Sequence, residues 1–152
     1  MQDAPTDLKL IAVDAEDLAV VSAHVQDAFV RRSAILHLPA QKRFVLGVKR
    51  YDWTAYAQGR KERVGAVLRF ERVLKVTQIG IAALKPEATL NLLAVSFAEI
   101  DAPSGTITLT FSGGAAVRLE VECLEGELRD IGPREKASAC PGHALDDAAP
   151  AA

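Results

Sequence analysis

Apolar and polar residues alternate along most of this chain, and the pattern predicts a β-rich domain. An apolar segment at 8–13 has the length of an edge strand. After it, Asp14 is a candidate helix N-cap, with Asp17 three residues on as in a capping box. An apolar stripe at helical spacing follows, formed by Leu18, Val21, Val25 and Phe29. We therefore expect an amphipathic helix near residues 15–27.

From Phe29 onward the period changes to two residues, which is typical of half-buried strands. The segments that we interpret as strands are 30–38, 43–49, 63–71, 74–78, 88–98, 106–111 and 117–121. Gly113-Gly114 lies between the last two and supplies the positive φ angles of a tight hairpin turn. The sequence thus predicts about seven strands.

The last apolar positions are spaced three or four residues apart: Val121, Leu124, Leu128 and Ile131. This spacing predicts a second helix that ends at Gly132-Pro133. The expected fold class is α+β, an antiparallel β roll or partly open barrel. Its order of about seven strands and then a C-terminal helix is pleckstrin-homology-like, with one additional N-terminal helix. Other small antiparallel barrels remain open. We expect a single globular domain over 1–133 and a disordered tail rich in Ala and Pro over 134–152.

Composition agrees with one globular domain. The chain has 152 residues, of which 49% are hydrophobic and 25% charged. No apolar run approaches the roughly 20 residues that span a bilayer, and the acidic start does not resemble a secretory signal. Two cysteines indicate a reducing compartment without a disulfide framework. These features predict a cytoplasmic protein.

Charge is distributed unevenly along the chain. Residues 1–30 hold one Lys against six acidic residues, 31–75 hold twelve Lys or Arg against three acidic residues, and 76–152 hold five against eleven. Such asymmetry favours an anionic partner if the cations gather on one surface. Alternatively, the basic and acidic blocks face each other across the fold and neutralise one another.

The basic block contains repeated basic pairs, and the single Trp and both Tyr lie within it. Cations with interleaved aromatic rings bind phosphate groups or acidic proteins. We predict that ligand-binding residues are Arg31, Arg32, Lys42, Arg43, Lys49, Arg50, Trp53, Tyr56, Arg60, Lys61 and Arg63. An isoelectric point near 5.9 disfavours nucleic acid. The predicted function is a non-enzymatic binding or adaptor module for an acidic protein or another anionic ligand. Charged residues on the solvated face of a sheet are the simpler explanation.

Catalytic and cofactor motifs are lacking in the sequence. It has no glycine-rich phosphate loop, dinucleotide fingerprint, nucleophile elbow or zinc-protease helix. The histidines are scattered at His24, His37 and His143. Cys123 and Cys140 add too few ligands for a structural zinc site. We expect no metal and no cofactor.

Two alternative functions remain open. A small enzyme would place its site in a cleft near Trp53, Tyr56 and His37, with a histidine or carboxylate directed inward. An oligomeric structural protein, for example a homodimer, would use the apolar residues Val45 and Val67 on otherwise polar strand faces.

Three stretches carry a resemblance: LKLIAVDAEDLAVVSAHVQDA from Leu8, RFVLGVKRYDW from Arg43 and AVRLEVECLEGELRDIGP from Ala116. Together they resemble an alphaproteobacterial family of small proteins classed as a domain of unknown function. The resemblance covers the chain from Leu8 to about Pro133. It implies a bacterial cytoplasmic protein, and it brings no catalytic residue, substrate or cofactor.

Overall fold

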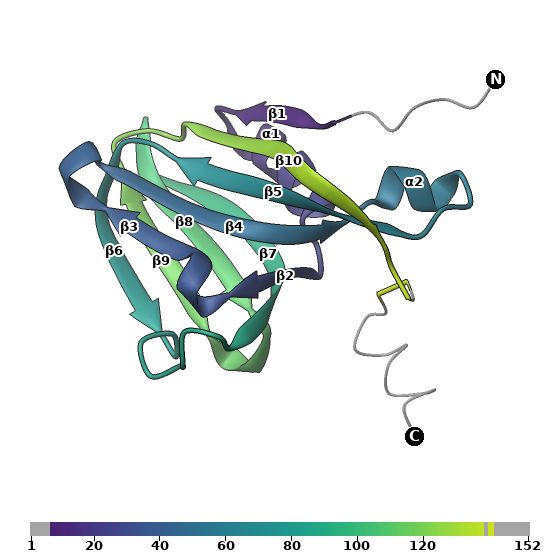
Figure 1. The fold of residues 1–152 in the computed structure, drawn as a ribbon. Helices are drawn as coiled ribbons and strands as arrows, with labels where there is room; N and C mark the ends of the chain where they lie inside the picture. The colour runs from purple at the N-terminus through teal and green to yellow at the C-terminus, as the bar shows by residue number, and fades with distance from the viewer. Residues whose placement is uncertain (1–6, 139, 142–152) are drawn as a thin grey trace.

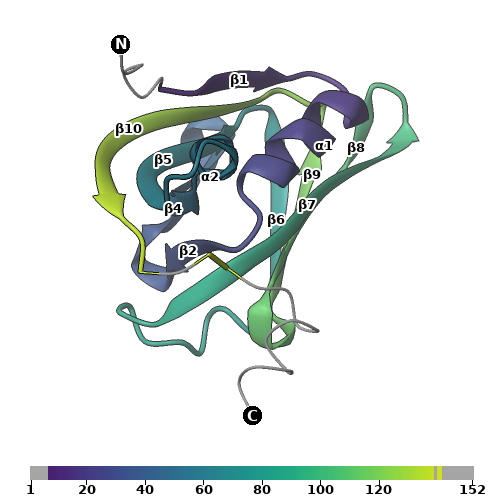
Figure 2. The same cartoon turned by 90° about the vertical axis from the view of Figure 1, so that its right-hand side faces the viewer.

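One strongly bent antiparallel sheet and two helices form the fold in the computed structural model, which describes residues 7–138, 140 and 141 (Figures 1 and 2). The strands are β1 (Lys9–Ala12), β2 (Ala28–Arg31), β3 (Ile35–Leu38), β4 (Arg43–Tyr51), β5 (Glu62–Phe70), β6 (Val73–Ile79), β7 (Thr89–Asp101), β8 (Ser104–Phe111), β9 (Ala116–Val121) and β10 (Gly126–Lys136). The helices are α1 (Ala15–His24) and α2 (Trp53–Ala57), with short 3-10 turns η1 (Arg32–Ala34), η2 (Pro39–Gln41) and η3 (Ser112–Gly114). An antiparallel sheet with helices confirms the predicted α+β class. The sheet is open rather than closed into a barrel.

The short strand β2 joins the two halves of the sheet. The strand order is β1-β10-β5-β4-β2-β7-β8-β9-β6, and β3 pairs with β4 outside this path. Phe29 of β2 pairs with Lys49 of β4, and the whole of β2 pairs with β7. Helix α1 lies across the opening between β1 and β7 (Figure 2). At the opposite side the Val73 N–H donates to the Lys42 carbonyl at 2.9 Å, which brings the start of β6 to the start of β4.

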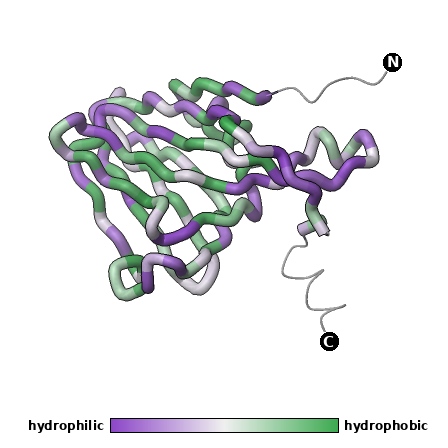
Figure 3. Tube along the Cα trace, viewed as in Figure 1, coloured by the Kyte–Doolittle hydropathy of each residue, from purple (hydrophilic) through white to green (hydrophobic). Residues whose placement is uncertain are grey.

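Every second residue of the strands points inward, and these inward residues from both halves of the sheet form the core. Phe44, Leu46, Leu68 and Phe70 of β4 and β5 are fully buried, as are inward residues of β8 and β9. Green apolar positions accordingly recur along the strands of the sheet, whereas purple hydrophilic positions predominate where the strands run toward α2 (Figure 3). Burial of this apolar surface is the main source of stability.

The predicted helix start and hairpin are confirmed. The Asp14 carboxylate accepts the Asp17 N–H at 2.8 Å, and the Asp17 carboxylate accepts the Val13 N–H at 3.0 Å. Strands β8 and β9 pair in register, and Gly113 and Gly114 adopt φ angles of 74° and 80° in the turn between them. The helix cap and the hairpin turn therefore occur at the residues that the sequence predicts for them.

The predicted C-terminal helix is wrong, because this segment is strand β10. It pairs with β5 and with β1. Leu124 and Leu128 are an even number of residues apart, so their spacing fits a strand face as well as a helix face. The intervening inward position is Gly126, where a Cβ atom would lie 2.9 Å from the Phe70 ring, and a glycine there concealed the period of two. Without this helix the pleckstrin-homology-like order is not confirmed.

The number of strands and the predicted tail also differ from the expectation. Ten strands occur in the described residues. Three of them lie beyond the predicted seven, because η1 separates β2 from β3, β10 replaces the helix, and β1 is the edge strand expected at 8–13. β10 continues to Lys136, so residues 134–136 of the predicted tail are sheet. Residues 139 and 142–152 lie outside the described part of the chain, and disorder there stays a prediction. Neither helix in the described residues is long and apolar enough to cross a membrane.

Candidate functional site

The basic block does not gather on one surface. Several of its cations instead pair with carboxylates, most of them from the acidic C-terminal third. The pairs that involve predicted site residues are Lys42–Glu122 at 3.5 Å, Arg43–Glu71 at 2.8 Å, Lys49–Glu135 at 2.8 Å, Arg50–Asp130 at 2.7 Å and Arg60–Glu62 at 3.6 Å. The alternative that the two blocks face each other across the fold therefore holds for Lys42, Lys49 and Arg50, whereas Arg43 and Arg60 pair with carboxylates of the basic block itself.

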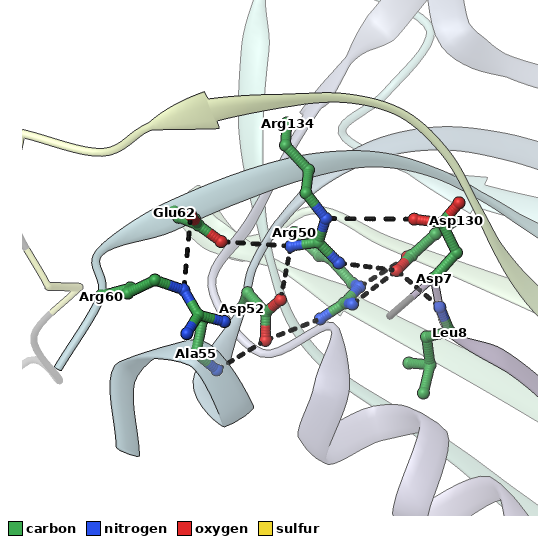
Figure 4. Close-up of polar contacts among 9 residues, drawn as sticks. All are labelled: Asp7, Leu8, Arg50, Asp52, Ala55, Arg60, Glu62, Asp130 and Arg134. Carbon is green, nitrogen blue, oxygen red and sulfur yellow. Dashed lines mark hydrogen bonds and ion pairs between the residues drawn. The ribbon is translucent and has the colours of Figure 1, made fainter. Parts of the chain in front are cut away.

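Arg50 is buried, although it was expected to bind a ligand together with its neighbour Lys49, which is exposed. Its Nε donates to Asp130 Oδ1 at 2.8 Å and its Nη2 to Asp130 Oδ2 at 2.7 Å (Figure 4). The two side chains are 3% and 0% exposed. Asp130 Oδ2 also accepts the Leu8 N–H at 2.8 Å, which ties the start of β1 to β10. The signal was present in the sequence, because the inward alternation from Phe44 through Val48 continues to position 50.

A second buried carboxylate, Asp52, extends this cluster to α2 (Figure 4). Its Oδ1 accepts the Ala55 N–H at 2.9 Å as the helix N-cap, and its Oδ2 accepts Arg134 Nη1 at 2.7 Å. Burial would raise the pKa of Asp52, but the Ala55 hydrogen bond and the guanidinium groups of Arg134 and Arg50 outweigh it and hold the pKa below its ordinary value. Asp52 therefore stays ionised at neutral pH and is unsuited to donate a proton.

Opposite charges in the cluster pair with one another, although Arg50 Nη1 has no hydrogen-bond partner among the described residues. Arg134 lies between Asp52 and Glu62, with its Nη1 3.3 Å from Glu62 Oε1. Buried ion pairs of this kind are costly to break and gain little in net stability. An incoming anion would have to displace an internal carboxylate. We interpret the cluster as the structural link between β1, β10 and α2.

Three aromatic rings lie beside this cluster at α2. The ring centroids of Tyr51 and Trp53 are 4.7 Å apart, and Tyr56 lies 6.0 Å from Tyr51. Burial, assisted by the neighbouring Cys140 thiol, raises the pKa of Tyr51 to about 12. His37 is exposed on β3 and pairs with Phe44, at the opposite end of β4 from Trp53. The structure does not form the predicted catalytic cleft from Trp53, Tyr56 and His37.

Lys42 and Arg43 line a different hollow, of about 550 Å³, at the start of β4. Its other charged residues are Arg69, Glu71, Arg72, Glu122 and Glu125. Each cation there has a glutamate partner. The hollow is thus nearly neutral and is a weak candidate for an anion site.

A groove of about 360 Å³ crosses the outer face of the sheet and is the best-formed candidate site. Gly47 and Gly65 form a floor without side chains, next to Lys49, which pairs with Gly65. Phe29 forms one wall, and the β10 bulge at 131–133 forms the other. At Gly65 a Cβ atom would lie 2.3 Å from the Gly132 carbonyl oxygen, so the bulge requires glycine there. The groove, defined by these residues, has the size of a small-ligand site.

Cations border this groove. Arg31 and Lys49 line it directly. Arg63 lies over the Phe29 ring at 3.7 Å and donates from Nη1 to the carbonyl oxygens of Asp27 and Lys49. This contact fixes the Phe29 wall by a cation–π interaction. Three of the predicted site residues therefore meet at one place, at the groove.

The remaining predicted residues lie elsewhere or carry no candidate site. Arg32 is half-buried in η1, and Lys61 is exposed at the start of β5 with its carbonyl accepting the Ala137 N–H. Within the described residues no three His, Cys, Asp or Glu side chains are placed to hold a metal ion. Cys123 and Cys140 are free thiols, and His143 lies outside the described residues.

Comparison with known families places the chain. A family model described as "Protein of unknown function (DUF2948)" matches residues 8–143. The chain belongs to this family. Searches of curated proteins and of solved structures found no match. The DUF2948 match covers all ten strands of the described sheet together with the groove. The predicted resemblance to a domain of unknown function is confirmed, and the family assigns no reaction to any residue.

Proposed function

We propose that this DUF2948 protein is a non-enzymatic binding module that engages an anionic partner through the groove. The observation that carries the proposal is the pairing of a bare apolar floor at Gly47 and Gly65 with the cations Arg31 and Lys49 at its border. The floor excludes water from an apolar part of the partner, and the cations attract its negative charge. The proposed site is therefore smaller than the predicted basic region 31–75, because only the part of that region that lines the groove is included.

Charge around the groove is positive although the chain has a net charge of −2. Arg129 is exposed on β10 and pairs with Val67, which itself pairs with Gly47. Arg31 and Lys49 thus line the groove, Arg63 lies over its Phe29 wall, and Arg129 lies on β10, two strands from Gly47. Glu135 is paired with Lys49, but both side chains are about half exposed, so this ion pair contributes little and is readily exchanged.

The proposal is tested with 1-anilinonaphthalene-8-sulfonate, a fluorescent anion with an apolar body. We expect saturable binding of one dye per folded chain, with an affinity that falls as salt rises. Gly47→Val fills the groove, and a Cβ at this position meets only Ala34 Cβ at 3.6 Å, an ordinary contact. This variant is expected to weaken dye binding at least about tenfold at an unchanged melting temperature.

Matched variants separate the groove from general surface effects. Val45→Leu enlarges a half-buried side chain on the same face of β4, two residues from Gly47, and should leave dye binding unchanged. Arg118→Gln removes an exposed cation from β9 and serves as the control for Arg31→Gln. Dye binding that survives Gly47→Val and Arg31→Gln, or that is equally sensitive to both controls, overturns the proposal.

A further inference from the structure

We infer that the ligand of the groove is an extended acyl chain of medium length with a carboxylate head, bound with the head at Arg31. This inference rests on the proposed function and names the class of its ligand. It follows from the direction, the length and the polarity of the groove, each of which is set by strand register.

The groove runs across the strands. Phe29 on β2, Lys49 on β4 and Gly65 on β5 are successive partners in the sheet, and Gly132 on β10 lies directly over Gly65. Three intervals between neighbouring strands separate β2 from β10. At about 4.8 Å each they span about 14 Å. An elongated ligand therefore fits this direction better than a compact one.

This length selects a chain of medium size. An extended chain of single bonds advances about 3.5 Å for every three bonds. A span of about 14 Å therefore accommodates about twelve bonds, that is, a chain of roughly twelve or thirteen carbon atoms. Each methylene buried in the groove strengthens binding, by less than in a fully enclosed site because the groove is open on one side. Carbons beyond the groove end gain nothing.

The two ends of the groove differ in polarity. At the β10 end the walls are Ile131 and Pro133, and Ile131 is 64% exposed in the part of the chain that the structure describes. At the β2 end Arg31 pairs with Thr89 of β7, and both line the groove. The apolar end thus fits the tail of the ligand, and the polar end fits its head.

Arg31 is the head-binding cation. It is exposed, and among the described residues it has no ion pair, so it can bind a ligand without first exchanging a partner, as Lys49 must do with Glu135 at 2.8 Å. A guanidinium offers two parallel N–H donors, which match the two oxygens of a carboxylate. The neighbouring Thr89 hydroxyl can donate to the same head.

The experiment is displacement of the bound dye by a series of fatty acids below their critical micelle concentrations. Decanoate is expected to displace the dye at a concentration at least about tenfold lower than hexanoate. From decanoate to hexadecanoate, each added methylene should lower the displacing concentration much less than each methylene added between hexanoate and decanoate. Decanol and decylammonium, which have the same chain without the carboxylate, should each be at least about tenfold weaker than decanoate. Arg31→Gln should abolish the difference between decanoate and decanol, Arg31→Lys should retain part of it, and Ile131→Ser should weaken decanoate with little effect on hexanoate.

Each outcome decides the inference. A potency that rises steadily to hexadecanoate, or equal potency of decanoate and decanol in the wild-type protein, overturns it. Dye that binds at the groove but is displaced by no alkanoate overturns the ligand class and leaves the proposed function standing. Dye binding that is insensitive to Gly47→Val refutes the proposed function itself.

Discussion

Arg50 and Asp130 neutralise each other inside the protein, where the two side chains are 3% and 0% exposed. Removal of both charges and their replacement by apolar groups is tolerated at many such sites, whereas removal of one leaves the other buried and unpaired. The Asp130 carboxylate also accepts the Leu8 N–H, so three segments depend on it. At this scale the position on the strand, rather than the residue type, decides whether an arginine binds a ligand or supports the fold.

Asp130→Ala is expected to lower the free energy of unfolding by about 3–5 kcal/mol, because it strands the buried Arg50 guanidinium. The double variant Arg50→Met/Asp130→Leu should lose clearly less than this single change. Glu135→Ala, which breaks the exposed pair with Lys49, should cost no more than about 1 kcal/mol and is the control. Urea unfolding measures all three. A cost of Asp130→Ala similar to that of Glu135→Ala would contradict the structural role.

At the scale of elements, β10 contributes to both the ion cluster and the candidate groove. It supplies Asp130 and Arg134 to the ion cluster, and its bulge at 131–133 forms a wall of the groove. The register of β10 against β5 shifts between Asp130 and Arg134, so the bulge rises over Gly65. The two roles of β10 therefore depend on one close approach between backbones.

Gly65→Ala tests this approach, with Gly47→Ala as its matched control. A Cβ at Gly65 would lie 2.3 Å from the Gly132 carbonyl oxygen, so the bulge must move, at a cost of about 1–3 kcal/mol. At Gly47 the nearest atom to a Cβ is 3.6 Å away, and alanine there should be neutral or stabilise by up to about 1 kcal/mol. Thermal and urea unfolding measure both variants. Equal stability of the two would show that the bulge is not held by this contact.

Elements with local signals were predictable from the sequence, and elements defined by partners were not. The cap at Asp14 and the turn at Gly113-Gly114 are determined by side chains within a few residues. β10 was mistaken for a helix because Gly126 interrupts its alternation, and only contact with Phe70 explains that glycine. Apolar residues spaced four apart fit one face of a helix and one face of a strand equally well, so this spacing alone does not distinguish the two.

The candidate site was predictable only in part, for the same reason. Arg31, Lys49 and Arg63 were selected from their charge, and the structure brings them to the groove. Gly47 and Gly65 occupy ordinary strand positions in the sequence, and nothing local shows that they lie diagonally across two neighbouring strands or that a bulge crosses Gly65. A groove floor is a property of strand register, which a single strand does not reveal.

At the scale of the whole molecule, the acidic C-terminal third neutralises much of the basic middle third. Glu122, Glu125, Asp130 and Glu135 each pair with a cation from residues 31–75. Exposed pairs of this group are weak individually and are screened by salt. Among the described residues that line the groove, Arg31 and Lys49 are charged and none is a carboxylate, although Glu135 of β10 pairs with Lys49.

Stability of the whole protein should decrease as the pH falls below about 6.5, and His24 is the group responsible. Burial and the nearby Arg50 lower the pKa of His24 from 6.5, although Asp52 and Asp130 partly oppose this. Its Nδ1 is buried without a hydrogen-bond partner among the described residues, so the folded state favours the neutral ring. Below pH 6.5 the unfolded chain binds a proton at this histidine more readily than the folded chain, so the free energy of unfolding falls as pH decreases toward the folded pKa.

The lowered pKa of Asp52 acts in a separate, more acidic range. Its contribution to stability is present above its ordinary pKa of 3.8 and is lost as pH falls through the lower folded value. Urea unfolding between pH 7 and pH 5 therefore isolates His24. We expect the wild-type protein to lose stability over that interval and His24→Gln to lose markedly less. Asp52→Asn should keep a slope at least as steep as that of the wild type, because the lost carboxylate no longer raises the pKa of His24. If His24→Gln has the same slope as the wild-type protein, another group controls the response, and the buried neutral histidine is not the pH-sensitive part of this fold.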